Sequence, residues 1–481
     1  MFPGTGGFRY FEYHFQLGSA RMLERASEDL HEKLHGKAEM SLHGKTSIAD
    51  RGQAFGMRLI TMAGGLEALK NPVLRGRVEK VLYRSAKSGF KAQTVAGKAF
   101  TKKSGSGSPT RAASTKPRRE FDLSPTEDQQ MIQEAARELA TEVLRPAAAG
   151  ADTERRAPAQ VLEQAAAMGM TLLSVPAELG GVAEERSAIT GVLVIEELAR
   201  GDMGLAVAIM ASGAVANALA NYGDSDQQAT FLPPFTHEQE PATGALAIQE
   251  PQPLFDPLAP STTAQRDGDH LVLDGVKSLV PGAENADLFI VSALVDDEPR
   301  LVIVEPGTDG LSVSPDPAMG LRAARTSALH LKSVRVPAAN LLGTAADHLD
   351  AVRRARLAWA AAAVGTGQAV LDHLKTYTVE RKAFGEPIAY RQAVAFTVAN
   401  IAIEVDALRL VVWRAAALLD EDKNASALIA QARALAARHG AQIGSDGVQL
   451  LGGHGFVKEF DNERWFRDLR ATGVLEGTLL V

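Results

Sequence analysis

Residues 446–481 read DGVQLLGGHGFVKEFDNERWFRDLRATGVLEGTLLV, and they combine a predicted helix end with an isolated carboxylate. Apolar residues among small ones, up to Leu451, predict a packed helix. Gly452-Gly453 should end that helix, because glycine adopts the positive φ values of a C-terminal cap. Two glycines also leave the backbone open to a bulky anion such as a pyrophosphate, although a plain helix stop has the same sequence.

Glu476 is the candidate catalytic residue of this stretch. It follows Val474 and Leu475 and precedes Gly477. Apolar surroundings disfavour an ionised carboxylate, which suits a general base. A solvated turn residue is the alternative, so the interpretation depends on the other motifs of the chain.

Three motifs of the stretch resemble the C-terminal domain of the acyl-CoA dehydrogenase family, with its Q-x-x-G-G-x-G turn, R-D pair and E-G-T. They read Gln449-Leu450-Leu451-Gly452-Gly453-His454-Gly455, Arg467-Asp468 and Glu476-Gly477-Thr478. The resemblance implies that Glu476 is the base and that Thr478 lies beside the cofactor.

The rest of residues 121–481 carries further motifs of the same family. They are Phe121, Leu123 and a slightly displaced Gln129, Pro176 to Gly181, Glu196-Glu197-Leu198-Ala199, Gly223 to Pro233, and the R-x-x-F-G-x-P-I-x-x-x-Q signature as Arg381, Phe384, Gly385, Pro387, Ile388 and Gln392. The resemblance therefore covers three quarters of the chain. In the first helix we expect Ser124 as the N-cap.

The resemblance implies FAD as the cofactor, because no side chain accepts the hydride that leaves an acyl thioester. It gives Arg381 to the FAD pyrophosphate and Phe384 to an apolar contact beside it, and it includes Gln392, Gly452 and Gln249 among the cofactor-binding positions. In the family, the positions of Arg381, Phe384, Gln449 and Gly453 reach the FAD of a neighbouring subunit. A homodimer or homotetramer, possibly a mixed assembly, is therefore expected. Arg356 is either close to the active site or a charge on a helix surface.

Two segments depart from the family pattern where the flavin would lie. Gln249 to Asp256, QEPQPLFD, replaces T-E-P-x-A-G-S-D, and Ser278 to Gly282, SLVPG, replaces W-I-T-N-G. The bulk of Leu254 and Phe255 is expected to compete for the cofactor's space. A member that binds flavin poorly, as a partner subunit or noncatalytic scaffold, is thus the alternative.

Composition divides the 481 residues into two regions. Residues 1–120 hold 22 Lys and Arg against 10 Asp and Glu, whereas the whole chain has a net charge of −7. The basic region indicates an anionic partner, and a protein built around that tail is a third possibility. Cysteine is absent, no secretory signal is recognisable, and no metal site is predicted, so a cytoplasmic location is expected. The uncharged run 203–222 should be a buried helix.

The predicted fold is mostly α with a central β-domain. Its parts are a basic, partly helical extension (1–100), a flexible linker (101–120), an N-terminal helical domain (121–243), a β-barrel-like domain (244–343) and a C-terminal four-helix bundle (344–481). The expected function is α,β-desaturation of an acyl-CoA or another acyl thioester, with an electron-transferring flavoprotein as acceptor.

Overall fold

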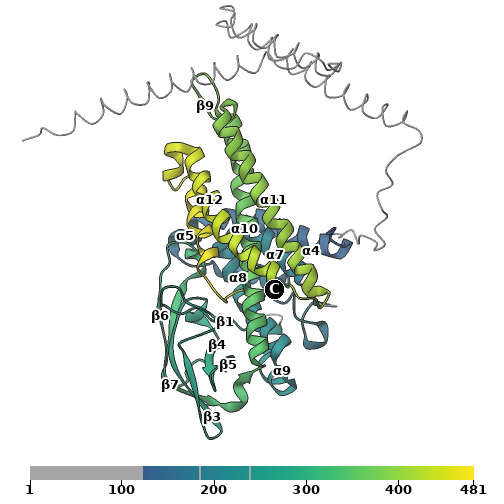
Figure 1. Ribbon diagram of the computed structural model, residues 1–481, viewed down its shortest axis with the longest axis vertical. Coiled ribbons are helices and arrows are strands. Elements are labelled where there is room, and N and C mark those ends of the chain that lie inside the picture. The colour runs from purple at the N-terminus through teal and green to yellow at the C-terminus, as the bar shows by residue number, and fades with distance from the viewer. Residues whose placement is uncertain (1–122, 184–185, 238–239) are drawn as a thin grey trace, which may run out of the picture. The chain divides into compact units, whose positions relative to one another are not determined.

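A computed structural model describes residues 123–183, 186–237 and 240–481 (Figure 1). The chain divides into two units at Arg119 and Glu120, of which Glu120–Val481 is the second. The predicted extension and linker lie outside the described residues, so the description below concerns the second unit.

Helices form the first third of this unit. They are α4 (Glu127–Leu139), the π-helical η2 (Ala140–Leu144), α5 (Arg145–Glu154), α6 (Ala159–Ala167), η3 (Ala177–Leu179), α7 (Ala188–Gly201), α8 (Met203–Tyr222), α9 (Ser225–Phe231) and η4 (Pro233–Thr236). The expected N-cap at Ser124 is wrong. Thr126 caps α4 instead, because Gln129 stands three residues later and completes a capping box with it.

Helix α8 is the uncharged run of the sequence. Among the described residues it is the one helix long and apolar enough to cross a membrane by length and composition. Most of its residues are buried, and they pack on α5, α6, α7 and the sheet. The prediction of a buried helix is confirmed.

The middle of the unit is one eight-stranded sheet. Its strands are β1 (Gly244–Ala247), β2 (Thr263–Asp267), β3 (His270–Pro281), β4 (Leu288–Val295), β5 (Glu298–Val304), β6 (Leu311–Pro315), β7 (Thr326–Pro337) and β8 (Leu341–Leu342). The strand order is β6-β7-β3-β2-β4-β5-β8, and β1 lies parallel to β4. In the described chain β6 and β8 do not pair, so the sheet is open and the barrel-like description needs correction.

Strand β4 is buried on both faces of the sheet. Leu288 and Ile290 of β4 pack with α8 and the start of α10, whereas the alternate residues Phe289 and Val291 pack with β2, β3 and β7. Side chains alternate between the faces of a strand, so one apolar strand serves two cores. This arrangement fixes the end of β1, where the candidate site begins.

The last part returns to helices. They are α10 (Ala345–Glu380), α11 (Gln392–Asp420), α12 (Ser426–Leu451) and α13 (Asn462–Leu469), with a small hairpin of β9 (Lys382–Ala383) and β10 (Glu386–Pro387) between α10 and α11. The short turns are η5 (Ala283–Asn285), η6 (Arg322–Ala324), η7 (Ala338–Asn340), η8 (Ile388–Tyr390), η9 (Gly452–Phe456) and η10 (Ala471–Gly473). Three long helices and one short one therefore make up the predicted bundle.

Helix α12 ends where the glycine pair predicted. Gly452 has φ +59°, a conformation that glycine adopts without strain. A Cβ on Gly452 or Gly453 would meet no atom within 4 Å, so the backbone there is open. The expected helix stop is confirmed.

Helices α7 and α10 cross with their backbones in contact. A Cβ on Gly365 of α10 would lie 1.9 Å from the carbonyl oxygen of Glu196 on α7. The Thr366 hydroxyl donates to the carbonyl of Ala199 at 3.1 Å across the same crossing. The first helical part and the last are therefore locked together at this point.

Candidate active site

Glu476 lies just after η10, and 7% of it is exposed. Arg356 of α10 donates from Nε to Oε2 and from Nη2 to Oε1, both at 2.9 Å. Arg433 of α12 donates from Nη2 to Oε1 at 3.2 Å. The carboxylate is thus held between two helices by two guanidinium groups.

The prediction of apolar surroundings for Glu476 is wrong. Val474 is 57% exposed and Leu475 is packed in the core, while the Glu476 side chain contacts the two arginines. Neighbours in sequence do not decide which way a side chain leaves an irregular segment. Arg356 lies at the site, and Arg433 is a contact that no motif indicated.

The backbone around Glu476 is held by two side chains. The Glu476 N–H donates to Oε1 of Gln249 at 3.2 Å, and the Trp359 indole donates to the carbonyl of Gly477 at 3.0 Å. Thr478 is buried and has φ +70°, which is rare for a β-branched residue. Strain of this kind concentrates at functional sites. Gln249, Glu476 and Thr478 therefore form one cluster.

Gln249 begins the altered loop of the sheet domain, and a buried ion pair holds that loop. Lys277 Nζ lies 2.7 Å from Glu250 Oε1, and both side chains are almost completely buried. Charge and hydrogen bonds from Lys277 outweigh burial and lower the pKa of Glu250 to about 2, whereas burial lowers the pKa of Lys277 to about 8. The loop thus keeps a fixed start next to Glu476.

The substituted residues of the two altered segments do not share one environment. Leu254 is fully exposed, and Phe255 packs partly against the cluster between α8 and the sheet. Leu279 is half-buried, and both Leu254 (φ +56°) and Leu279 (φ +52°) adopt positive φ. Part of the added bulk is therefore absorbed by the core.

The remaining predicted residues form a second cluster at the far ends of α10 and α12. Arg381, Gln392, Gln449, Gly452 and Gly453 are exposed, and Phe384 is 95% exposed with φ +56°. The Tyr377 hydroxyl donates to the carbonyl of Leu451 at 3.3 Å and lies 2.8 Å from Nδ1 of His454, which joins the two helix ends.

The two clusters lie far apart along α10, one at Arg356 in its N-terminal half and the other just beyond its C-terminal end. Arg356 contacts Glu476, while Arg381 follows the end of the helix about 37 Å further along its axis, at 1.5 Å per residue. Figure 1 shows the β9 hairpin at the tip of the long helices, far from the C-terminal residue. One chain therefore presents two separate parts of the predicted site.

The Arg467-Asp468 pair ties the three parts of the unit together. Asp468 is buried and accepts the N–H of Leu321 at 2.6 Å, and Arg467 lies 2.8 Å from Asp152 of α5. Burial first, and then the charge of Asp202, raise the pKa of Asp468 to about 7. This motif supports the architecture and is not in contact with Glu476 through any of these bonds.

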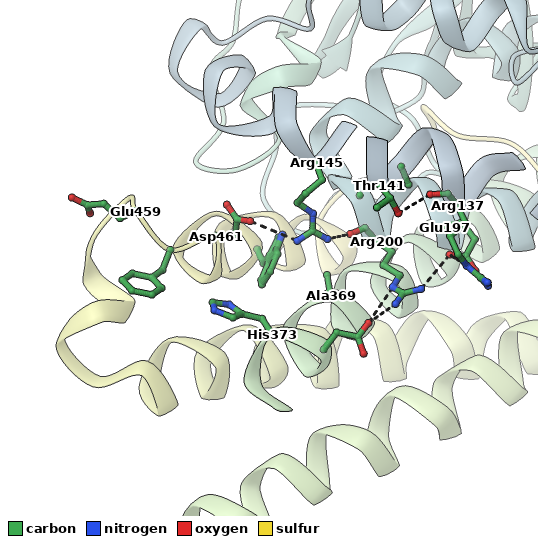
Figure 2. Close-up of a pocket in the computed structure, with 14 residues that line it drawn as sticks. Arg137, Thr141, Arg145, Glu197, Arg200, Ala369, His373, Glu459 and Asp461 are labelled. Atoms are coloured by element: carbon green, nitrogen blue, oxygen red, sulfur yellow. Dashed lines mark hydrogen bonds and ion pairs between the residues drawn. The ribbon is translucent and has the colours of Figure 1, made fainter. Parts of the chain in front are cut away.

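A cavity of about 670 Å³ lies between α4, α7, α10 and α13. Arg145 and Arg200 line it, and their partners Asp461 and Asp372 belong to the same walls. Figure 2 shows the pair of Arg145 and Asp461, with His373 across from Arg145. Both of these arginines are paired with carboxylates of the cavity walls, and none of the predicted site residues lines it.

The fold and the site define a helix–sheet–helix protein with a buried carboxylate where the sheet domain meets the helical bundle. Comparison with protein families identifies its three parts as the N-terminal, middle and C-terminal domains of acyl-CoA dehydrogenase, at residues 126–239, 245–334 and 348–480. This chain belongs to the acyl-CoA dehydrogenase family.

Individual relatives agree with this assignment. The chain is 32% identical to the short-chain specific acyl-CoA dehydrogenase of Bos taurus mitochondria, over 73% of this chain and 87% of that protein. It is 33% identical to cyclohex-1-ene-1-carbonyl-CoA dehydrogenase of Geobacter metallireducens, over 73% of this chain and 95% of that protein. The structure of butyryl-CoA dehydrogenase from Megasphaera elsdenii matches 74% of this chain and 96% of its own, with a TM-score of 0.68 and 27% identity.

Proposed function

We propose that this protein is an FAD-dependent acyl-CoA dehydrogenase that forms an α,β double bond in an acyl thioester, with Glu476 as the base. The observation that carries the proposal is the buried Glu476 carboxylate, held where α10, α12 and the end of β1 meet. The relatives bear the names of enzymes acting on acyl-CoA, which supports catalysis over the noncatalytic scaffold.

Desaturation removes a proton from the α-carbon and a hydride from the β-carbon. FAD, when bound, accepts the hydride. Glu476 takes the proton on its carboxylate, which Arg356 and Arg433 hold in place. The electron pair of the broken α C–H bond becomes the π bond as the hydride leaves.

The residues present fit FAD in two groups. Arg381 offers an exposed guanidinium for the pyrophosphate, and Gly452 and Gly453 offer an open backbone at the end of α12, which Tyr377 joins to the end of α10. Gln392 and Gln449 add exposed amides. Gln249 and Thr478 would hold the flavin side near Glu476. Positive φ at Leu254, Leu279, Phe384 and Thr478 places backbone strain in both groups.

The separation of these groups supports a homodimer or homotetramer in which each FAD touches two subunits. Large apolar side chains are exposed along the hairpin and α11, the surface such an assembly would cover. They are Phe384, Tyr390, Phe396, Ile403 and Leu410.

Two further partners are proposed, an electron acceptor from a similar solved structure and an anionic partner from the charge of the chain. A structure reported with an electron-transferring flavoprotein of Acidaminococcus fermentans has a TM-score of 0.68 and 29% identity to this chain, which supports such a flavoprotein as electron acceptor. The basic residues 1–119 favour an anionic partner, and binding that falls steeply with salt would test it. We place the protein in the cytoplasm.

The test is oxidation of butyryl-, isobutyryl-, octanoyl- and palmitoyl-CoA with an artificial electron acceptor. The purified protein should be yellow, with flavin near one per chain, and should oxidise at least one thioester. Glu476→Gln should lower kcat by ~10²–10⁴-fold, because a general base is lost. Glu459→Gln, at an exposed position, is the control.

Wild-type turnover in Glu476→Gln would show that another group is the base. A colourless protein that gains flavin only with a second subunit of the same family would instead support the partner-subunit alternative.

A further inference from the structure

Arg433 connects the carboxylate of Glu476 to the turn that precedes it. Its Nη2 donates to Glu476 Oε1 at 3.2 Å, and its Nη1 donates to the carbonyl of Thr472. The side chain is 14% exposed. One guanidinium therefore spans both ends of the segment 472–476.

The turn itself rests on α12 with little freedom. Thr472 is completely buried, and its hydroxyl donates to the carbonyls of Ala436 at 3.3 Å and Leu469 at 2.8 Å. A Cβ on Gly473 would lie 3.0 Å from Cβ of Ala437. Because turn and helix are in direct contact, α12 fixes where Glu476 emerges.

Two cations and one anion face each other at this place. Arg356 approaches the Glu476 carboxylate from α10 and Arg433 from α12, while the neutral Gln249 side chain meets its backbone from the end of β1. Burial lowers the pKa of Arg433 and the charge of Glu476 opposes that effect. Glu476 thus also relieves the repulsion between the two arginines.

We propose that Arg433 is a positioning residue that holds the Glu476 carboxylate against α12 and supplies the second of the two cations that contact it. The inference rests on the proposed role of Glu476 as base. Without Arg433 the carboxylate keeps its bonds to Arg356 but loses the tie to the turn and one of its two cations.

The experiment compares Arg433→Met and Arg433→Lys in the FAD-loaded enzyme, with the thioester that the wild type oxidises fastest. The acid limb of kcat/KM against pH reports the ionisation of the free enzyme's base. In Arg433→Met it should move up by about one pH unit, as expected for loss of an opposite charge at this distance. Arg433→Lys should return the limb to the wild-type pH, because the charge is restored.

A second measurement does not depend on turnover. Nuclear magnetic resonance of ¹³C-labelled glutamate carboxyl groups should show one titration that disappears in Glu476→Gln and shifts to higher pH in Arg433→Met. Arg438→Met, on an exposed position of the same helix, should leave both the titration and the acid limb unchanged. If Arg433→Met fails to fold, Arg433→Gln takes its place as the neutral variant.

An unmoved acid limb and titration in the folded neutral variant would overturn the inference. A kcat/KM loss that is equal at every pH and not rescued by lysine would also overturn it, since it would mean a merely structural role. If Glu476→Gln keeps wild-type turnover, it is the proposed function that fails.

Discussion

Asp468 is a buried carboxyl group that the folded protein holds near three other charged side chains. Burial and the nearby charge of Asp202 raise its pKa to about 7, and they outweigh the N–H of Leu321 and the charges of Arg467 and Arg464, which favour the ionised form. A folded-state pKa above the ordinary value of 3.8 means that the folded protein binds a proton that the unfolded chain releases.

The stabilisation from that proton should be complete at acid pH and be lost as the pH rises from about 4 to about 7, with a slope of up to ~1.4 kcal/mol per pH unit. Asp468→Asn should remove this slope from the free energy of unfolding. Urea unfolding of both proteins across this range measures it, with exposed Asp309→Asn as control. Parallel curves for wild type and Asp468→Asn would contradict the assignment.

The ion pair between Lys277 and Glu250 joins strand β3 to the segment that follows β1. Glu250 also accepts hydrogen bonds from the N–H groups of Ser261 and Thr262 and from the Thr262 hydroxyl. Both partners are charged between pH of about 2 and about 8. The pair therefore joins the two segments that flank the predicted flavin position.

Lys277→Met should cost ~3–5 kcal/mol of unfolding free energy, because it leaves a buried carboxylate without its cation. The double variant with Glu250→Met should recover part of that loss, since burying neither charge is often close to neutral. Denaturant unfolding of the single and double variants gives the comparison. Equal stability of Lys277→Met and wild type would show that the pair contributes little.

At the scale of the molecule, the two clusters of site residues cannot meet within one chain, so catalysis should require at least two copies. This can be tested by complementation between two inactive variants. Glu476→Gln keeps the Arg381 cluster, and Arg381→Glu keeps the Glu476 cluster. In a mixed dimer, one of the two sites would contain both intact halves.

Co-expression of these variants should give about a quarter of wild-type activity if subunits assemble at random into symmetric dimers. Light scattering of the purified mixture establishes the number of chains. Activity no higher than that of the separate variants, in a confirmed mixed assembly, would place both halves of the site in the same subunit.

Much of this molecule could be predicted from local patterns in the sequence. The stop of α12 at Gly452 and the burial of α8 follow from glycine chemistry and an uncharged run, and both are confirmed. The partners of Glu476 could not be predicted in the same way. Arg433 and Glu476 meet only after η9, α13 and η10 have packed on α12. Apolar neighbours in the sequence, such as Val474, do not predict such contacts.

The crossing at Gly365 has a consequence for how this sequence can vary. Ala360 to Ala363 lie shortly before Gly365 on α10, and alanine is the smallest step from glycine. A methyl group at position 365 would nevertheless overlap the carbonyl of Glu196. In a randomised library of this helix, many of the buried alanines can be replaced by another small residue if the surrounding side chains shift slightly. No such replacement exists for Gly365, because even alanine would overlap the backbone of α7. Selection of the library for folded protein should therefore return glycine at this position.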